Sequence, residues 1–199
     1  MFEEEHEMEQ PVQKSQLNIR QKRRLFYKLC GEFREYKNAK KSFIATTRFN
    51  NATWAENEEY RKKHNLQCVY GSPQAIHSQV TDKMFVFVLE MNNDENKIMG
   101  IGIIKNKPKH GKHRIYANEE YNRYSYESKY RIDRAEMDEE EEKIMTIFDA
   151  LCFKGSTTHL KKLRGIKLFP LERLFRCRNI IDLDGFVQKM VLKRFGENN

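Results

Sequence analysis

The sequence predicts an α+β fold in which a small, curved antiparallel β-barrel is decorated by helices. Two apolar runs, 84–91 and 97–105, flank the turn-rich segment 92–96, and this pattern is typical of a β-hairpin. The second run carries Gly100 and Gly102, and glycine inside a strand marks a bulge, a bend or a close approach by another backbone or a ligand. Short strands and amphipathic helices on both sides of the hairpin complete the α+β pattern.

The N-terminal half contains two predicted helices. Residues 1–15 are acidic and polar, and we predict that they are disordered ahead of a single domain over 16–199. A helix is predicted over 16–36, with Leu25, Leu29 and Phe33 on one face and five Lys or Arg residues on the other. After it we expect a strand over 43–47, a helix over 54–64 and a strand over 67–70.

The C-terminal half continues with strands and then helices. Strands are predicted over 115–116 and 124–132, the second from the alternation of tyrosine with polar residues. The clearest helix begins at Asp138, which forms a capping pair with Glu141. A C-terminal helix is predicted over 182–196.

Positive charge is concentrated in two segments. The chain has a net charge of +8, and its first ten residues hold five Glu and no Lys or Arg, so the remainder carries +13. Residues 105–134 hold nine basic and four acidic residues (+5), and residues 154–178 hold eight and one (+7). Clustered basic residues attract phosphate-rich partners. We therefore predict that nucleic acid is held by the following residues: Lys105, Lys107, Lys109, Lys112, Arg114, Arg123, Lys161, Lys162 and Arg164.

No catalytic residue, metal site or cofactor is predicted. The four cysteines are widely spaced in apolar contexts, and none of the six histidines pairs with a cysteine at metal-ligand spacing. The acidic run 138–142 stands at a predicted helix start, where carboxylates complement the helix dipole. The sequence therefore favours a protein that is not an enzyme, with a cryptic nuclease as the less favoured alternative.

The order of elements around the hairpin resembles the PUA-like superfamily, which includes PUA, ASCH, EVE and YTH modules. The matching pieces are 69–73, 84–90 and 99–103, within about residues 66–175. The resemblance implies a barrel that binds RNA or modified nucleobases in a cleft. YTH modules use several tryptophans, and this chain has only one, so methylated-base reading is not predicted. The implied pocket residues are Trp54, Tyr70, Ser72, Gly102, Asn106, Tyr116 and Tyr124.

Each pocket residue also has a structural interpretation. Trp54 either anchors its helix to the core or lines the pocket, and Ser72 either faces a ligand or belongs only to a turn. Tyrosines such as Tyr116 and Tyr124 either stack on bases or pack in the barrel. The sequence leaves these alternatives open.

We expect a non-enzymatic nucleic-acid-binding module, with RNA ahead of DNA. The alternative is a structural or interaction subunit of a virion or a larger assembly, with a protein partner on the N-terminal helix. The composition resembles that of proteins from large cytoplasmic DNA viruses. With no secretory signal and no run of about 18 apolar residues, we expect no membrane partner and an intracellular location, in cytoplasm, nucleus or virion.

Overall fold

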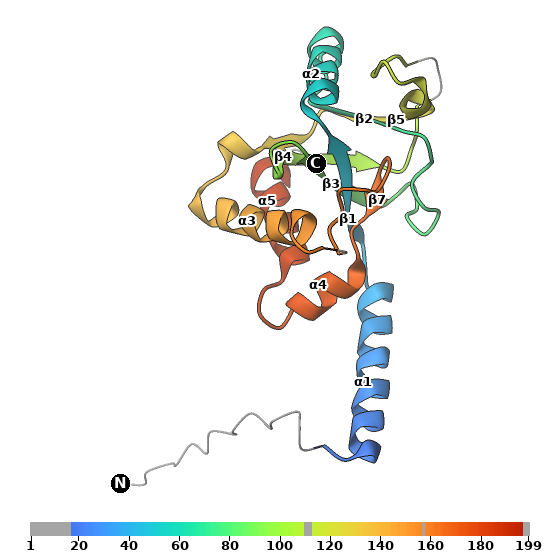
Figure 1. The fold of residues 1–199 in the computed structure, drawn as a ribbon, viewed down its shortest axis with the longest axis vertical. Helices are drawn as coiled ribbons and strands as arrows, with labels where there is room; N and C mark the ends of the chain where they lie inside the picture. The colour runs from blue at the N-terminus through green and yellow to red at the C-terminus, as the bar shows by residue number, and fades with distance from the viewer. Residues whose placement is uncertain (1–16, 110–112, 157, 197–199) are drawn as a thin grey trace. The chain divides into compact units, whose positions relative to one another are not determined.

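The computed structural model describes residues 17–109, 113–156 and 158–196 of the chain (Figure 1). The chain divides into two compact units, Met1–Ala39 and Lys40–Asn199, whereas the sequence predicts one domain over 16–199. The predicted disordered segment 1–15 lies outside the described residues. None of the helices in the described ranges has the length and apolar character needed to cross a membrane.

The smaller unit contains one helix, α1 (Ile19–Asn38), close to the predicted helix over 16–36. Asn18 and Gln21 form a capping box in which each side chain accepts a hydrogen bond from the other residue's backbone N–H at 2.9 Å. No residue of α1 is buried. The helix therefore carries several exposed apolar side chains: Ile19, Leu25, Phe26, Tyr27 and Leu29.

The larger unit is built on a mixed five-stranded sheet with the order β6-β4-β3-β1-β7. Its two central strands, β1 (Ser42–Phe49) and β3 (Phe85–Asn92), run parallel. The neighbouring strands β4 (Lys97–Lys105), β6 (Arg131–Asp133) and β7 (Lys167–Leu168) all pair antiparallel. The predicted hairpin is confirmed as β3 and β4.

The predicted antiparallel barrel is wrong. β2 (Cys68–Ser72) and β5 (Tyr124–Ser128) form a separate two-stranded sheet, and within the described residues the sheets do not close on each other. A helix and β2 lie between β1 and β3 in the chain, and this long crossover lets the two strands run parallel. The strands β6 and β7 form the two opposite edges of the sheet, and they are only 3 and 2 residues long.

Local capping residues set the helix boundaries. Asn50 is the N-cap of α2 (Asn51–His64). The C-cap is Asn65, which adopts the left-handed conformation at φ 52°. The capping pair Asp138 and Glu141 at the start of α3 (Glu139–Phe153) is confirmed. The remaining helical elements are the short turns η2 (Glu119–Asn122) and η3 (Arg134–Glu136), followed by α4 (Leu171–Cys177) and α5 (Leu183–Phe195).

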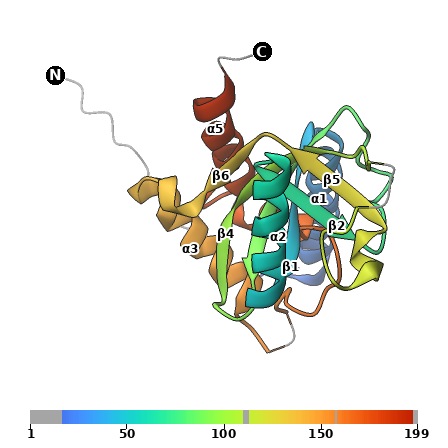
Figure 2. The same ribbon diagram turned by 90° about the horizontal axis from the view of Figure 1, so that it is seen from above.

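Strand alternation gives the sheet two buried faces. One face of β1 presents Phe43, Ala45 and Phe49 to a cluster that includes Tyr70 of β2 and Tyr126 of β5. Figure 2 shows α3 on one side of β4 and the β2–β5 pair on the other. Both faces of the central strands are therefore covered, which accounts for their nearly continuous apolar sequence.

Two predicted strands differ from the structure. The predicted strand over 124–132 is interrupted between β5 and β6, so its two ends belong to different sheets. The predicted strand over 115–116 is not formed. Ile115 and Tyr116 are buried in a loop instead, and their backbone N–H groups both donate to the Asn122 side chain.

Candidate nucleic-acid interface

A basic groove lies where β1 ends, α2 begins and the loop 161–164 passes over them. Its volume is about 380 Å³. Three residues that were predicted to bind nucleic acid, Lys161, Lys162 and Arg164, line it, as does one predicted pocket residue, Tyr116. We call it the Arg48 groove. Its lining residues include Arg48, Phe49, Asn50, Thr53, Tyr116, Asn118, Tyr121, Lys161, Lys162 and Arg164.

Arg48 is a partly buried cation at the base of this groove. Its Nε donates to Leu160 O at 2.8 Å, and one Nη1 hydrogen bond reaches Gly165 O at 3.0 Å. Its other contacts are with Thr46, through the backbone carbonyl at 3.2 Å and through the hydroxyl. Among the described residues no carboxylate forms an ion pair with Arg48.

Burial lowers the pKa of Arg48 to about 10, so the guanidinium is still charged at neutral pH. The four hydrogen bonds that Arg48 donates all go to neutral oxygens. They use four of the five guanidinium N–H groups. A buried charge without a counter-charge is costly, and an anion entering the groove would reduce that cost. Arg48 therefore gives the groove a positive charge that its hydrogen-bond partners do not neutralise.

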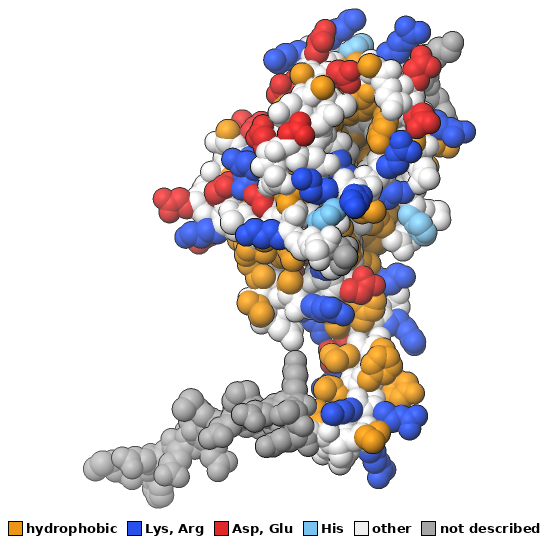
Figure 3. All heavy atoms as spheres, viewed as in Figure 1, with side chains coloured by type: hydrophobic (Ala, Val, Ile, Leu, Met, Phe, Trp, Pro, Cys, Tyr) orange, Lys and Arg blue, Asp and Glu red, His pale blue; other side chains and the backbone are white. Residues whose placement is uncertain are grey.

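Three cations lie around the rim of the Arg48 groove. Lys161 Nζ donates to Asn96 Oδ1 at 2.8 Å, and Lys162 is exposed. Arg164 Nη2 lies 3.7 Å from Glu120 Oε2, but both side chains are exposed and such pairs contribute little. In the view of Figure 3, Lys and Arg side chains alternate with Asp and Glu over the larger unit, so exposed charge alone does not identify a site.

The loop that carries these cations is held close to the sheet. Arg48 binds the carbonyls at both ends of the loop, Leu160 and Gly165. Gly165 has φ 64°, and a side chain there would overlap the hydroxyl of Ser72. Arg48 thus positions the loop that carries the three cations as well as adding its own charge.

Aromatic rings form one wall of the groove. Tyr116 is 8% exposed, and its hydroxyl accepts a hydrogen bond from Asn57 at 3.0 Å, so its position is fixed by the core. Tyr121 is half-buried and meets the Tyr116 ring edge-on at 6.4 Å. Tyr121 also packs against the core cluster, and it is the less buried of the two rings in this wall.

The first turn of α2 also lines the groove through Asn50 and Thr53. The positive end of its dipole favours an anion. Asp94 already accepts from the Asn51 N–H at 2.9 Å, and Asn50 Oδ1 accepts from Thr53 N at 2.8 Å. We therefore expect the end of α2 to contribute less to the binding of an anion than Arg48 does.

The described residues of the predicted basic loop 105–114 do not line the Arg48 groove. Lys107 Nζ is 3.5 Å from Asp82, and Lys109 is paired with Glu127. Lys105 lines a different, apolar groove, and its ammonium lies 5.0 Å from the centre of the Phe85 ring. Arg123 is exposed and does not line the Arg48 groove, and Lys112 lies outside the described residues.

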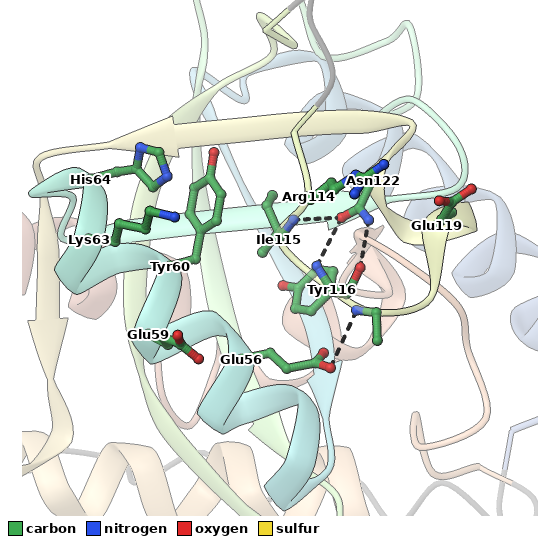
Figure 4. A pocket seen from close by; sticks show the side chains of 11 residues that line it. Glu56, Glu59, Tyr60, Lys63, His64, Arg114, Ile115, Tyr116, Glu119 and Asn122 are labelled. Carbon is green, nitrogen blue, oxygen red and sulfur yellow. Dashed lines mark hydrogen bonds between the residues drawn. The ribbon is translucent and has the colours of Figure 1, made fainter.

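Arg114 lines a larger pocket of about 550 Å³ beside α2, shown in Figure 4. Three carboxylates, those of Glu56, Glu59 and Glu119, share this pocket with Arg114 and Lys63, so positive charge is not concentrated there. Asn122 binds the backbone of 115–116 on the pocket wall, and Glu56 Oε1 accepts from Ala117 N at 3.3 Å.

Several predicted pocket residues are placed inside the fold. Tyr70 has no exposed surface, and its hydroxyl donates to Glu90 Oε1 at 2.6 Å. A side chain on Gly102 would overlap that hydroxyl, so the glycine makes room for Tyr70 and not for a ligand. Ser72 is 1% exposed and accepts from Ile166 N at 3.4 Å. These three residues therefore stabilise the core.

The other predicted pocket residues are also held by packing. Trp54 meets Phe49 edge-on at 5.1 Å and lies between the guanidinium groups of Arg61 and Arg131, at 5.4 and 5.7 Å. Asn106 Nδ2 donates to Val80 O at 2.7 Å. Tyr124 packs against the core cluster. Of the predicted pocket residues, Tyr116 is the one that reaches the Arg48 groove.

Sequence reasoning missed Arg48 and did not include Tyr121 among the pocket residues, although Tyr121 belongs to the tyrosine-rich stretch after the basic loop. A single arginine in the otherwise apolar and small-residue strand 42–49 was the available signal for Arg48. Comparison of the chain with known protein families, with curated proteins and with solved structures finds no match. The described residues also contain no cluster of three or more His, Cys, Asp or Glu side chains that could hold a metal ion.

Proposed function

We propose that this protein binds single-stranded nucleic acid in the Arg48 groove, with RNA ahead of DNA. The observation that carries the proposal is the partly buried guanidinium of Arg48, which has no carboxylate partner among the described residues and lines the groove together with three further cations. Phosphate is the anion that several closely spaced cations favour, and arginine suits its geometry.

The groove suits a single strand of nucleic acid better than a duplex. The loop 161–164 and the rings of Tyr116 and Tyr121 both line the groove. A flexible strand can place phosphates against Arg48 and turn a base onto Tyr121, whereas a duplex keeps its bases stacked inside.

The test is fluorescence anisotropy with a short labelled single strand, as RNA and as DNA. Changing Lys161, Lys162 and Arg164 to serine should weaken binding to every sequence and make the log–log salt slope about 2 less steep, since each phosphate contact contributes about 0.7 on single strands. The matched control changes Lys105, Lys107 and Lys109 to serine, which removes the same charge outside the groove.

The control variant should bind as the unmodified protein does, apart from a small general effect of net charge. Equal losses in both variants would show that binding follows net charge and not the groove. Absence of binding by the unmodified protein at about 50 mM salt, where electrostatic binding is strong, would overturn the proposal.

A second candidate function is an interaction subunit that binds a protein partner through α1. The supporting observation is that four of its apolar side chains are well exposed: Leu25 38%, Phe26 62%, Tyr27 67% and Leu29 44%. Exposed apolar side chains grouped on a helix are typical of binding surfaces. Changing Phe26 and Leu29 to serine should abolish the binding of a partner protein that is captured by residues 17–39, and it should leave oligonucleotide binding unchanged.

A further inference from the structure

A second groove on the larger unit is apolar, in contrast to the Arg48 groove. It has a volume of about 510 Å³ and lies between the strands β3 and β4 and the helix α5. Such a volume is typical of small-molecule sites, which are mostly apolar with a few polar groups that fix the ligand's orientation.

The strand register separates the polar and apolar parts of this groove. Ser42, Phe85 and Lys105 are paired across β1, β3 and β4, so they form one row on the sheet face. Two residues away along β3 and β4, Phe87 and Ile103 form the next row on the same face. The polar end is therefore at the row of Lys105, and the apolar end is at the row of Phe87.

The apolar end has a buried floor and exposed walls. Phe87 and Ile103 are 5% and 4% exposed and form the floor. The walls include Leu192, which is 64% exposed, and the rings of Tyr130 and Phe195, which meet edge-on at 5.2 Å. An acyl chain lying here would remove apolar surface from water on both the protein and the ligand.

The polar end carries positive charge without acidic partners. Lys41 and Lys105 both line the groove, and none of its described lining residues is acidic. Lys105 extends over the Phe85 ring, with its ammonium 5.0 Å from the ring centre. Gln188 Nε2 donates to Ser42 Oγ at 3.3 Å, and this pair adds uncharged polar groups beside the two lysines.

We propose that this groove binds a single-chain anionic amphiphile of the fatty-acid class. The hydrocarbon chain lies on Phe87 and Ile103, and the carboxylate lies between Lys41 and Lys105. A free amphiphile fits better than a bilayer surface because the floor is recessed behind Phe85, Tyr130 and Leu192, so only a chain that has left the bilayer can reach it. This site is separate from the Arg48 groove and does not depend on the proposed function.

The test compares a fluorescent polyene fatty acid with its methyl ester, both below their micellar concentrations. The ester keeps the chain and lacks the charge. The unmodified protein should bind the acid about tenfold more tightly than the ester, the effect expected of two partly exposed ion pairs. Changing Lys41 and Lys105 to glutamine should remove this preference and leave binding of the ester unchanged.

Two further variants complete the test. Lys143→Gln with Lys154→Gln removes the same charge from exposed positions outside the groove and should bind both ligands as the unmodified protein does. Leu192→Glu should weaken both ligands, and the acid more strongly, because it places a carboxylate at the apolar end. Leu192 is well exposed, so the fold should tolerate this change.

Three results would overturn the proposal. The first is no saturable binding of either ligand, and the second is equal affinity of the unmodified protein for acid and ester. The third is a dimer in sedimentation analysis that Leu192→Glu dissociates and the fatty acid does not affect, which would assign the groove to a second copy of this chain. In each case oligonucleotide binding by the Arg48 groove would be unaffected, so the two proposals can fail separately.

Discussion

Two arginines of the larger unit, Arg48 and Arg131, are both largely withdrawn from solvent but have opposite surroundings. Arg131 binds both oxygens of the fully buried Glu90 at 3.1 and 2.9 Å and also Asp133 at 2.5 Å. Arg48 binds only neutral oxygens. Burial alone would lower both pKa values, but Glu90 raises the pKa of Arg131 above its usual value, while that of Arg48 falls to about 10.

The difference separates a structural charge from one that can serve a ligand. The Arg131 network joins β3 and β6, and Tyr70 of the second sheet donates to the same Glu90 carboxylate. Its charges are neutralised within the protein. Arg48 lies beside open space with its charge unmatched, so an external anion gains more there.

The largest expected effect is on stability. Arg131→Met leaves Glu90 buried without its partner and should lower the free energy of unfolding by about 3–5 kcal/mol. Arg48→Met removes hydrogen bonds and no ion pair, so its loss should be about 1–2 kcal/mol, together with the loss of oligonucleotide binding. Urea denaturation measures both, and equal destabilisation by the two variants would break the comparison.

Gly102→Val tests whether the hairpin glycine serves the core or a ligand. The new side chain would overlap the Tyr70 hydroxyl, so we expect a loss of about 1–3 kcal/mol of stability from overpacking. Gly31→Ala is the control, since no atom lies within 4 Å of the added group. A Gly102→Val protein with unchanged melting temperature and lost binding would instead support a ligand at Gly102.

Tyr121 and Tyr124 should separate stacking from packing. Tyr121→Ala removes a ring that both lines the Arg48 groove and packs against the core cluster, so oligonucleotide affinity should fall by about 1–3 kcal/mol and the melting temperature should fall as well. Tyr124→Ala should lower the melting temperature and leave affinity unchanged, because Tyr124 packs against the core. Anisotropy and thermal unfolding of both variants measure the two effects, and the reverse result would move the base-binding surface to β5.

The smallest effect is the response to acid. The hydrogen bond from Arg194 lowers the pKa of Glu141, and that from Arg134 lowers the pKa of Glu142, below the ordinary value of 4.5. These carboxylates bind fewer protons in the folded state, so stability should be constant above that pH and decline as the pH falls through their lowered pKa values. Arg194→Gln should reduce the decline measured by thermal unfolding across this range.

The same titration applies to one member of the Arg131 network. Burial alone would raise the pKa of Asp133, but the hydrogen bond from Arg131 lowers it overall. Within the described part of the chain Arg48 has no carboxylate partner, so its hydrogen bonds to Leu160 and Gly165, at the two ends of the loop 161–164, should persist at acid pH. An oligonucleotide affinity that fell in the same pH range as stability would show that the groove depends on a carboxylate.

The sequence by itself determined the local elements of this protein. Asn18, Asp138 and Asp182 begin helices because their side chains satisfy backbone N–H groups only a few residues away. The β3–β4 hairpin likewise follows from two apolar runs around a short turn. Such features depend on neighbours in the chain, so pattern and propensity are sufficient to find them.

Tertiary structure alone decided which way the strands run and where the charges are matched. The parallel pairing of β1 with β3 depends on the path of the chain between them, and local patterns do not contain that path. Lys107 and Lys161 belong to the two basic segments, but Lys107 lies 3.5 Å from Asp82 and Lys161 lines a groove. The effect of a charge depends on its burial and on the distance to its counter-charge, and both are set only when distant segments pack together.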